Sequence, residues 1–86
     1  MATTVSLKVY DNSTLVPVIA SFDNEGHIRP LYVRIDGDAY KIHTSWLKPG
    51  FARTSVFQCQ LIDNGQLKPL ILTYYHQENV WTIPKG

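Results

Sequence analysis

The segment Leu31–Ile42, LYVRIDGDAYKI, carries the clearest fold signal in this chain of 86 residues. Apolar and polar residues alternate on both sides of Asp36-Gly37, and this pair suits a two-residue type I′ turn, in which both positions need a positive φ. Alternation and turn agree on one register, so the segment predicts an antiparallel hairpin with one apolar face. In that register Val33 pairs with Tyr40 and Leu31 with Ile42 on the inner side, and Tyr32 lies opposite Lys41 on the outer side.

The same pattern continues along the rest of the chain, where turn-forming residues recur about every ten positions. Asn64-Gly65 predicts a second tight hairpin, which pairs Cys59 with Leu70 and Phe57 with Leu72. Strands are expected over 17–22, 31–35, 40–46, 55–62, 70–75 and 80–83, with a further one over 4–10, and no helix is expected. Thr44 and Trp46 are expected on the same face as Ile42. The predicted core is Val18, Phe22, Leu31, Val33, Ile35, Tyr40, Ile42, Phe57, Cys59, Leu61, Leu70, Leu72 and Trp81.

The predicted fold class is therefore all-β, a small antiparallel barrel or sandwich of six to seven strands. The whole chain, 1–86, is read as a single domain because folding units usually exceed about 50 residues. Within it, residues 1–13 form an N-terminal strand or a partly ordered extension. Residues 14–46 form a first three-stranded meander, and residues 54–84 form a second.

One phrase occurs twice, 40 positions apart: DNEGHIRPLYV over Asp23–Val33 and DNGQLKPLIL over Asp63–Leu72. Its Asp, Asn and Gly form turns, and its proline predicts a strand start, a bulge or an edge, because proline lacks the N–H of a central ladder. A true duplication and convergence on common hairpin chemistry both remain open. Folding leaves only Arg29 and Lys68 unexplained, and a pseudo-twofold relation would place them at equivalent positions.

Composition excludes several classes of function. Eight basic and seven acidic residues give a formal net charge of +1, so strong electrostatic capture of nucleic acid or of an anionic membrane is not expected. No apolar run approaches the roughly 20 residues of a membrane span. Cys59 is the only cysteine, so no disulfide can form within the chain. The N-terminus shows no secretory signal pattern, and a cytoplasmic location is expected.

The residues that most often carry chemistry are explained by folding. His27, His43 and His76 lack the spacing of metal ligands and are predicted to be surface residues beside turns. Cys59 lies on the apolar side of its strand and is predicted to be a core thiol rather than a nucleophile. We therefore expect no catalytic residue, no metal site and no cofactor, and the chain is not expected to be an enzyme.

One surface is a candidate binding face. The outward sides of the hairpin strands carry Arg29, Tyr32, Arg34, Lys41 and His43, to which Lys68 is added from the second copy of the phrase. Basic residues interleaved with an aromatic ring on a small β domain are typical of proteins that bind single-stranded nucleic acid. An ordinary solvated face is the alternative reading. We predict a non-catalytic binding or protein-interaction module whose partner is unknown, with another protein, a second copy or nucleic acid as candidates.

Over Phe22–Ile42, FDNEGHIRPLYVRIDGDAYKI, the chain resembles a group of short β-rich proteins from Firmicutes whose function is unknown. The shared pattern is an apolar strand, D-x-x-G, a P-L-Y strand, a glycine turn and an aromatic-x-Ile strand. A Phe-Gln-Cys strand at 57–59 and a final aromatic strand at 80–82 complete it, so the resemblance covers about Val16–Thr82, with a shorter middle loop here. It implies a β fold and a bacterial or phage origin, and it implies no activity.

Overall fold

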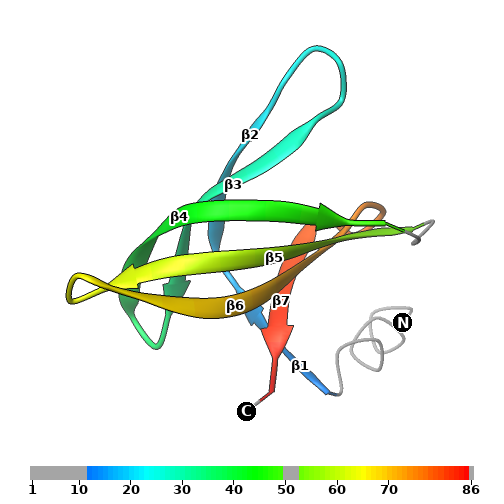
Figure 1. The fold of residues 1–86 in the computed structure, drawn as a ribbon. Coiled ribbons are helices and arrows are strands. Elements are labelled where there is room, and N and C mark those ends of the chain that lie inside the picture. Colours follow the sequence, from blue (N-terminus) through cyan, green and yellow to red (C-terminus); the bar gives the residue numbers. More distant parts are fainter. Residues whose placement is uncertain (1–11, 50–52, 86) are drawn as a thin grey trace.

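A computed structural model of the chain describes residues 12–49 and 53–85, which form seven strands in one antiparallel sheet (Figure 1). The prediction of an all-β fold is confirmed, and the described residues contain no helix. The strand expected over 4–10 and the centre of the loop expected over 47–53 lie outside the described residues. The strands are β1 (Ser13–Val16), β2 (Val18–Phe22), β3 (Ile28–Ile35), β4 (Asp38–Lys48), β5 (Thr54–Asp63), β6 (Gln66–Tyr75) and β7 (Val80–Pro84).

The sheet is curled, and its two edge strands meet at one residue. The strand order is β1-β7-β6-β5-β4-β3-β2, so β1 and β2 lie at opposite ends of the sheet although only Pro17 separates them in the chain. Arg34 N donates a hydrogen bond to Pro17 O at 3.0 Å, which ties this junction to β3. The result is a half-barrel whose edges are joined at Pro17. The two meanders, β2-β3-β4 and β5-β6-β7, lie side by side in it, because β4 pairs with β5.

Both predicted tight hairpins have the expected register. Asp36 and Gly37 have φ values of 51° and 86°, Val33 pairs with Tyr40, and Tyr32 pairs with Lys41. In the second hairpin Asn64 and Gly65 have φ values of 52° and 78°. There Cys59 pairs with Leu70 and Phe57 with Leu72, as the alternation requires. The expected pairing of Leu31 with Ile42 is wrong, because β3 and β4 separate beyond Tyr32 and Lys41.

A bulge in β3 changes which residue enters the core. Ile19 of β2 pairs with Tyr32, but the next residue, Ala20, pairs with Pro30, so Leu31 is the extra residue. A bulge reverses the alternation of side chains beyond it. Pro30 therefore takes the fully buried position, and Leu31 is only half-buried. Pro30 thus marks a bulge, one of the three positions that its chemistry allows.

A second bulge, in β4, overturns the expected placement of Trp46. Ile42 pairs with Leu61 and Thr44 with Gln60, which leaves His43 as the extra residue. Beyond the bulge Ser45 faces the buried Cys59, and Trp46 points to the outer side of the sheet, where it is 55% exposed. Thr44 and Trp46 therefore do not share the face of Ile42. No glycine marks the position of this bulge.

The core lies on the concave side of the sheet, around Trp81. The Trp81 ring lies 4.8 Å from that of Tyr74 and 5.8 Å from that of Phe57, centroid to centroid. Phe22 was expected in this core, but it lies at its margin: its ring contacts that of Tyr74 edge-on at 5.9 Å between centroids, and the residue is 58% exposed. The predicted residues Val18, Leu31, Ile35, Tyr40 and Leu70 are half-buried. The buried apolar residues are Val16, Val33, Ile42, Phe57, Cys59, Leu61, Leu72, Tyr74 and Trp81.

Candidate binding cleft between β3 and β4

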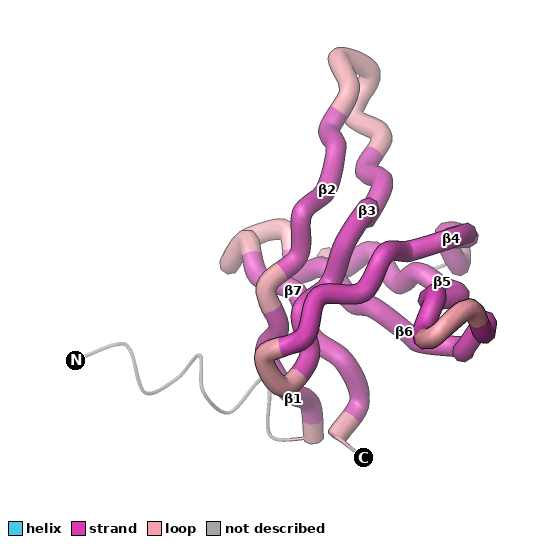
Figure 2. The backbone as a smooth tube through the Cα atoms, turned by 90° about the vertical axis from the view of Figure 1, so that its left-hand side faces the viewer, coloured by secondary structure: helices cyan, strands magenta, loops and turns pink. Residues whose placement is uncertain are grey.

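The sheet is split where β3 and β4 diverge. The two strands pair only over Tyr32–Ile35 and Asp38–Lys41. Beyond that point the first half of β3 stays with β2, while the second half of β4 stays with β5. Figures 1 and 2 show the β2–β3 hairpin rising away from β4 as a separate arm. The space between the two strands is a cleft of about 890 Å³, within the range of ligand-binding pockets, roughly 300–1,000 Å³.

One wall of the cleft is a free strand edge. The N–H of Arg34 points to the β2 side, so its neighbours Val33 and Ile35 direct their backbone groups to β4. Tyr40, which pairs with Val33, directs its own backbone groups to β3. The same alternation followed through the β4 bulge turns the backbone N–H and C=O of Ser45 and Leu47 away from β5 and into the cleft. No strand among the described residues pairs with β4 on this side beyond Lys41.

The opposite wall is a strand edge interrupted by proline. The carbonyl of His27 accepts a hydrogen bond from Asp23 N at 3.0 Å, so His27 and, two residues on, Arg29 direct their backbone groups to β2. Pro30 consequently directs its backbone nitrogen to the cleft, where it has no hydrogen to donate. The β3 wall is therefore a weaker template for another strand than the β4 wall.

The side chains around the cleft are cationic and aromatic. Its lining includes Arg29, Lys41, His27 and His43 and contains no aspartate or glutamate. Within the described part of the chain, neither Arg29 nor Lys41 forms an ion pair. Arg29 and Lys41 have no ion-pair partner among the described residues, and the lining contains no carboxylate, so the cleft beside them attracts anionic groups; His27, at the arm tip, is engaged by Asp23.

The cleft gathers four of the six residues that were predicted to form a binding face: Arg29, Tyr32, Lys41 and His43. Arg34 does not line the cleft. It lies two residues beyond Tyr32 on β3, beside a smaller cavity that Val18 and Ile19 help to line. Lys68 lies apart, on β6, where its Nζ donates a hydrogen bond to Asp63 Oδ2 at 2.7 Å. This contact raises the pKa of Lys68, and it gives that side chain a structural role.

Two residues of the cleft were not anticipated. Trp46 and Leu47 line it and are 55% and 63% exposed. Trp46 reaches the outer side only because of the bulge at His43, and there it adds a second ring to Tyr32, which is 43% exposed. A sequence signal did exist, since a tryptophan and a leucine in adjacent positions cannot both face the core of a regular strand.

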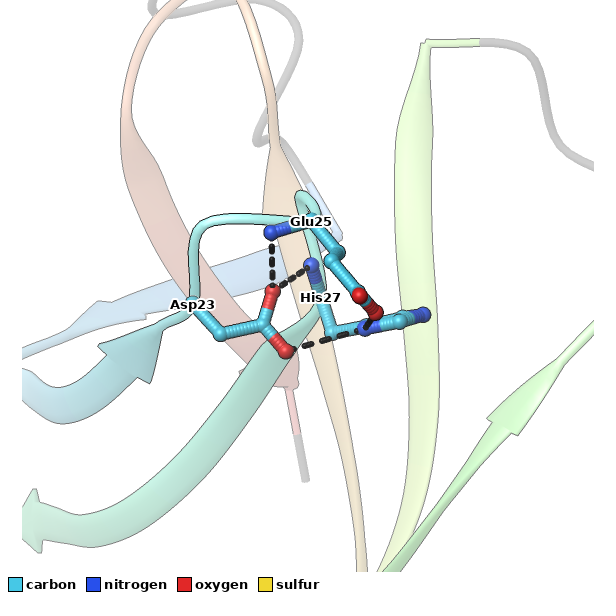
Figure 3. Close-up of side chains that lie close together, drawn as sticks. All are labelled: Asp23, Glu25 and His27. Carbon is cyan, nitrogen blue, oxygen red and sulfur yellow. Dashed lines mark hydrogen bonds and ion pairs between the residues drawn. The ribbon is translucent and has the colours of Figure 1, made fainter.

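A cluster of ionisable groups lies at the tip of the β2–β3 arm. Figure 3 shows Asp23, Glu25 and His27 pointing toward one another. One carboxylate oxygen of each acidic residue and one ring nitrogen of His27 lie within 4.8 Å of each other. Asp23 Oδ1 accepts hydrogen bonds from the backbone N–H of His27 at 2.8 Å and of Glu25 at 2.9 Å, and His27 Nδ1 lies 2.9 Å from Asp23 Oδ2. The bonds from His27 lower the pKa of Asp23. All three residues are exposed, and Asp23 serves the turn itself.

Two nucleophilic side chains lie elsewhere. Cys59 is completely buried, and burial raises the pKa of its thiol to about 11, so it is protonated at neutral pH. A hydrogen bond of 2.7 Å joins Ser55 Oγ to His76 Nε2. Among the described residues no carboxylate bonds to His76, whereas a catalytic serine–histidine pair usually has a third group that orients the histidine.

Comparisons with known proteins add no family to this description. No protein-family model matches the chain, and no curated protein or solved structure is significantly similar to it. The resemblance to Firmicutes proteins therefore stays a prediction. Over the described ranges, the structure offers no helix with the length and apolar character needed to cross a bilayer.

Proposed function

We propose that this protein is a non-catalytic binding module and that its ligand is an extended chain in the cleft between β3 and β4. The lining carries the proposal. Arg29 and Lys41, which have no ion-pair partner among the described residues, lie beside two exposed rings in a cleft without a carboxylate. Exposed aromatic rings beside an arginine are more typical of binding surfaces than of ordinary solvated faces.

The split in the sheet favours another polypeptide as the partner. An extended peptide can add a strand to a free sheet edge, and β4 offers such an edge along the cleft. A second candidate is single-stranded nucleic acid, favoured by one observation: Tyr32 and Trp46 expose their rings beside Arg29 and Lys41. Stacking on aromatic side chains and attraction of phosphate to cations are the usual means of binding such strands.

The absence of catalysis and a cytoplasmic location are part of the same proposal. The protonated thiol of Cys59 and the isolated Ser55–His76 pair supply no activated nucleophile. A single free cysteine suits a reducing compartment. The resemblance to Firmicutes proteins supports a bacterial origin.

The binding proposal can be tested with simple anionic chains. Isotopically labelled protein is titrated at low ionic strength with a capped oligoglutamate peptide and, separately, with a short oligothymidylate, while backbone NMR shifts are followed. We expect shifts in the cleft walls for at least one probe, and Arg29→Ala or Lys41→Ala should weaken binding by about tenfold, because each removes a charge-assisted contact.

Matched controls separate the cleft from general surface charge. Arg34→Ala removes the same charge from the same strand as Arg29→Ala. Lys68→Ala removes the same charge as Lys41→Ala but from β6, and neither control residue lines the cleft. Both controls should leave affinity nearly unchanged. The proposal fails if neither probe shifts the cleft resonances, or if the controls weaken binding as much as the cleft variants do.

A further inference from the structure

We propose that the ligand of the cleft is an extended polypeptide segment of alternating acidic and apolar residues, which adds to β4 as a new strand. This inference rests on the proposed binding function and specifies its partner. In it, the backbone groups of Ser45 and Leu47 pair with the segment, while Arg29 and Lys41 receive its carboxylates. The cleft gives three separate grounds for this assignment: its backbone edge, the two faces of its lining, and its charge.

The backbone edge selects β4 as the strand that pairs. Ser45 and Leu47 direct their N–H and C=O groups into the cleft, and no described residue pairs with them there. On the facing wall Pro30 has no N–H to offer. Beyond the bulge at His43, a strand in the cleft therefore finds two cleft-facing residues on β4, Ser45 and Leu47, whereas Pro30 interrupts the row of donors on β3. Natural sheets usually protect free edges with proline or with charged side chains, and the β4 edge has no proline between Ile42 and Lys48.

The two faces of the cleft select an alternating sequence. On the outer side of the sheet lie Arg29, Tyr32, Lys41 and Trp46, all exposed. On the inner side the lining includes the apolar residues Ile28, Leu47 and Phe57, together with the small hydroxyl side chains of Ser45 and Ser55. Side chains of an added strand point alternately to these two sides. Acidic residues then meet the cations outside, while the intervening apolar residues cover Leu47, which is otherwise 63% exposed.

Charge and backbone together favour a polypeptide over nucleic acid. A phosphate chain can contact Arg29 and Lys41 and stack its bases on Tyr32 and Trp46. It has no regular alternation of N–H and C=O, however, so it leaves the edge at Ser45 and Leu47 without a ladder. Only a polypeptide strand uses the cations, the apolar inner side and the backbone edge at once.

The decisive probe is a capped peptide of alternating glutamate and valine, compared with two N-methylated forms of itself. Methylation of alternate amides blocks one edge of the peptide and leaves the other able to pair, while methylation of every amide removes all its donors. The side-chain charges are the same in all three. We expect the half-methylated peptide to retain most of the affinity and the fully methylated one to lose about tenfold or more, since several net hydrogen bonds disappear.

A pair of protein variants tests the same contact from the other side. Ser45→Pro deletes the N–H that faces the cleft and spares the β4–β5 ladder, because Ser45 directs its backbone groups away from β5. Ser45→Ala keeps this N–H and removes only the hydroxyl. Ser45→Pro should lower the affinity for the glutamate–valine peptide by about tenfold, and Ser45→Ala should bind like the wild type. Backbone NMR spectra show whether each variant keeps its fold, and if Ser45→Pro does not, the methylated peptides decide alone.

Each result separates this inference from the binding function on which it rests. Loss of binding with the fully methylated peptide, together with retention by Ser45→Ala, supports strand addition. Equal binding of all three peptides overturns strand addition but leaves an anion-binding cleft. Binding of oligothymidylate alone, sensitive to Arg29→Ala, overturns the polypeptide partner while the proposed function stands. If no probe shifts the cleft resonances, both proposals fail.

Discussion

The two copies of the repeated phrase occupy comparable places in the two meanders, but they do different things. In the first, Asp23 is engaged by His27, and Arg29 has no ion-pair partner among the described residues. In the second, Asp63 is engaged by Lys68 across the β5–β6 hairpin. The first turn has one residue more than the second, and His27 after it contacts Asp23 as Lys68 contacts Asp63. Arg29 is therefore left to line the cleft. The second copy keeps its cation in a contact that supports the fold.

The two cations of the phrase have different roles, but its two prolines have the same role in the backbone. Pro69 pairs with Gln60, whose backbone groups point to β4, so its nitrogen faces the free side of β6 just as that of Pro30 faces the cleft. Each proline removes a donor from a strand edge that no strand within residues 12–49 and 53–85 pairs with over that stretch. Their surroundings differ, since Pro30 is buried at a bulge and Pro69 is exposed.

The largest contrast is expected between Tyr40 and Trp81, the aromatic residues in the last strands of the two meanders, β4 and β7. Trp81 is buried against Tyr74 and Phe57, whereas Tyr40 is half-buried. Trp81→Ala should lower the free energy of unfolding by about 3–5 kcal/mol, a large share of the total for a small domain. Tyr40→Ala should cost less than half as much, about 1–2 kcal/mol, since it buries less area. Urea unfolding measures both, and equal losses would contradict this asymmetry.

The next effect concerns the protected edge of β6. Pro69→Ala restores an N–H on the free side of that strand and should promote association between molecules, because an unprotected edge pairs with other strands. Sedimentation of the variant should show a larger species than the wild type at the same concentration. Leu67→Ala is the control, since it removes exposed apolar surface from the same strand and changes no backbone donor. If Leu67→Ala associates as strongly as Pro69→Ala, the restored N–H is not the cause of association.

A smaller effect should separate the two cations of the phrase. Arg29→Ala should weaken binding of an acidic peptide and leave the urea midpoint unchanged, because Arg29 has no ion-pair partner in the described structure. Lys68→Ala should leave binding unchanged and lower the urea midpoint slightly, since its pair with Asp63 is exposed to solvent. Equal behaviour of the two variants in both measurements would contradict the different roles given to Arg29 and Lys68.

The smallest effect is local and concerns the tip of the first arm. The pKa of Asp23 lies below its ordinary value of 3.8 in the folded protein, mainly because the His27 N–H bonds to its carboxylate. The ionised form therefore stabilises the folded turn above pH 3.8, and this contribution disappears as the pH falls through the lower folded pKa. The amide shifts of Glu25 and His27 should move in that acid range. Asp23→Asn should abolish the transition, because an amide accepts a bond but does not titrate there.

The fold class could be predicted because local chemistry determines it. Asp36-Gly37 and Asn64-Gly65 specify tight turns, and alternation then sets the register of both hairpins, as the structure confirms. β1 was missed, because it is a short strand that pairs only with β7, far along the chain. Of the six residues predicted to form a binding face, the structure brings Arg29, Tyr32, Lys41 and His43 to one cleft, and their role there stays a prediction. Lys68 lies apart, because its contact with Asp63 depends on the geometry of the second turn.

The sequence by itself determined that this chain forms hairpins and which residues turn them, because a turn and its alternating flanks are local properties. Only the tertiary structure decided where β3 and β4 part, and which residues face the gap. The physical reason lies in two bulges, at Leu31 and His43, each of which inserts one residue and reverses the faces beyond it. Pro30 allowed a bulge without fixing it, and no glycine marks the one at His43; together the two bulges place Pro30 in the core and Trp46 at the cleft.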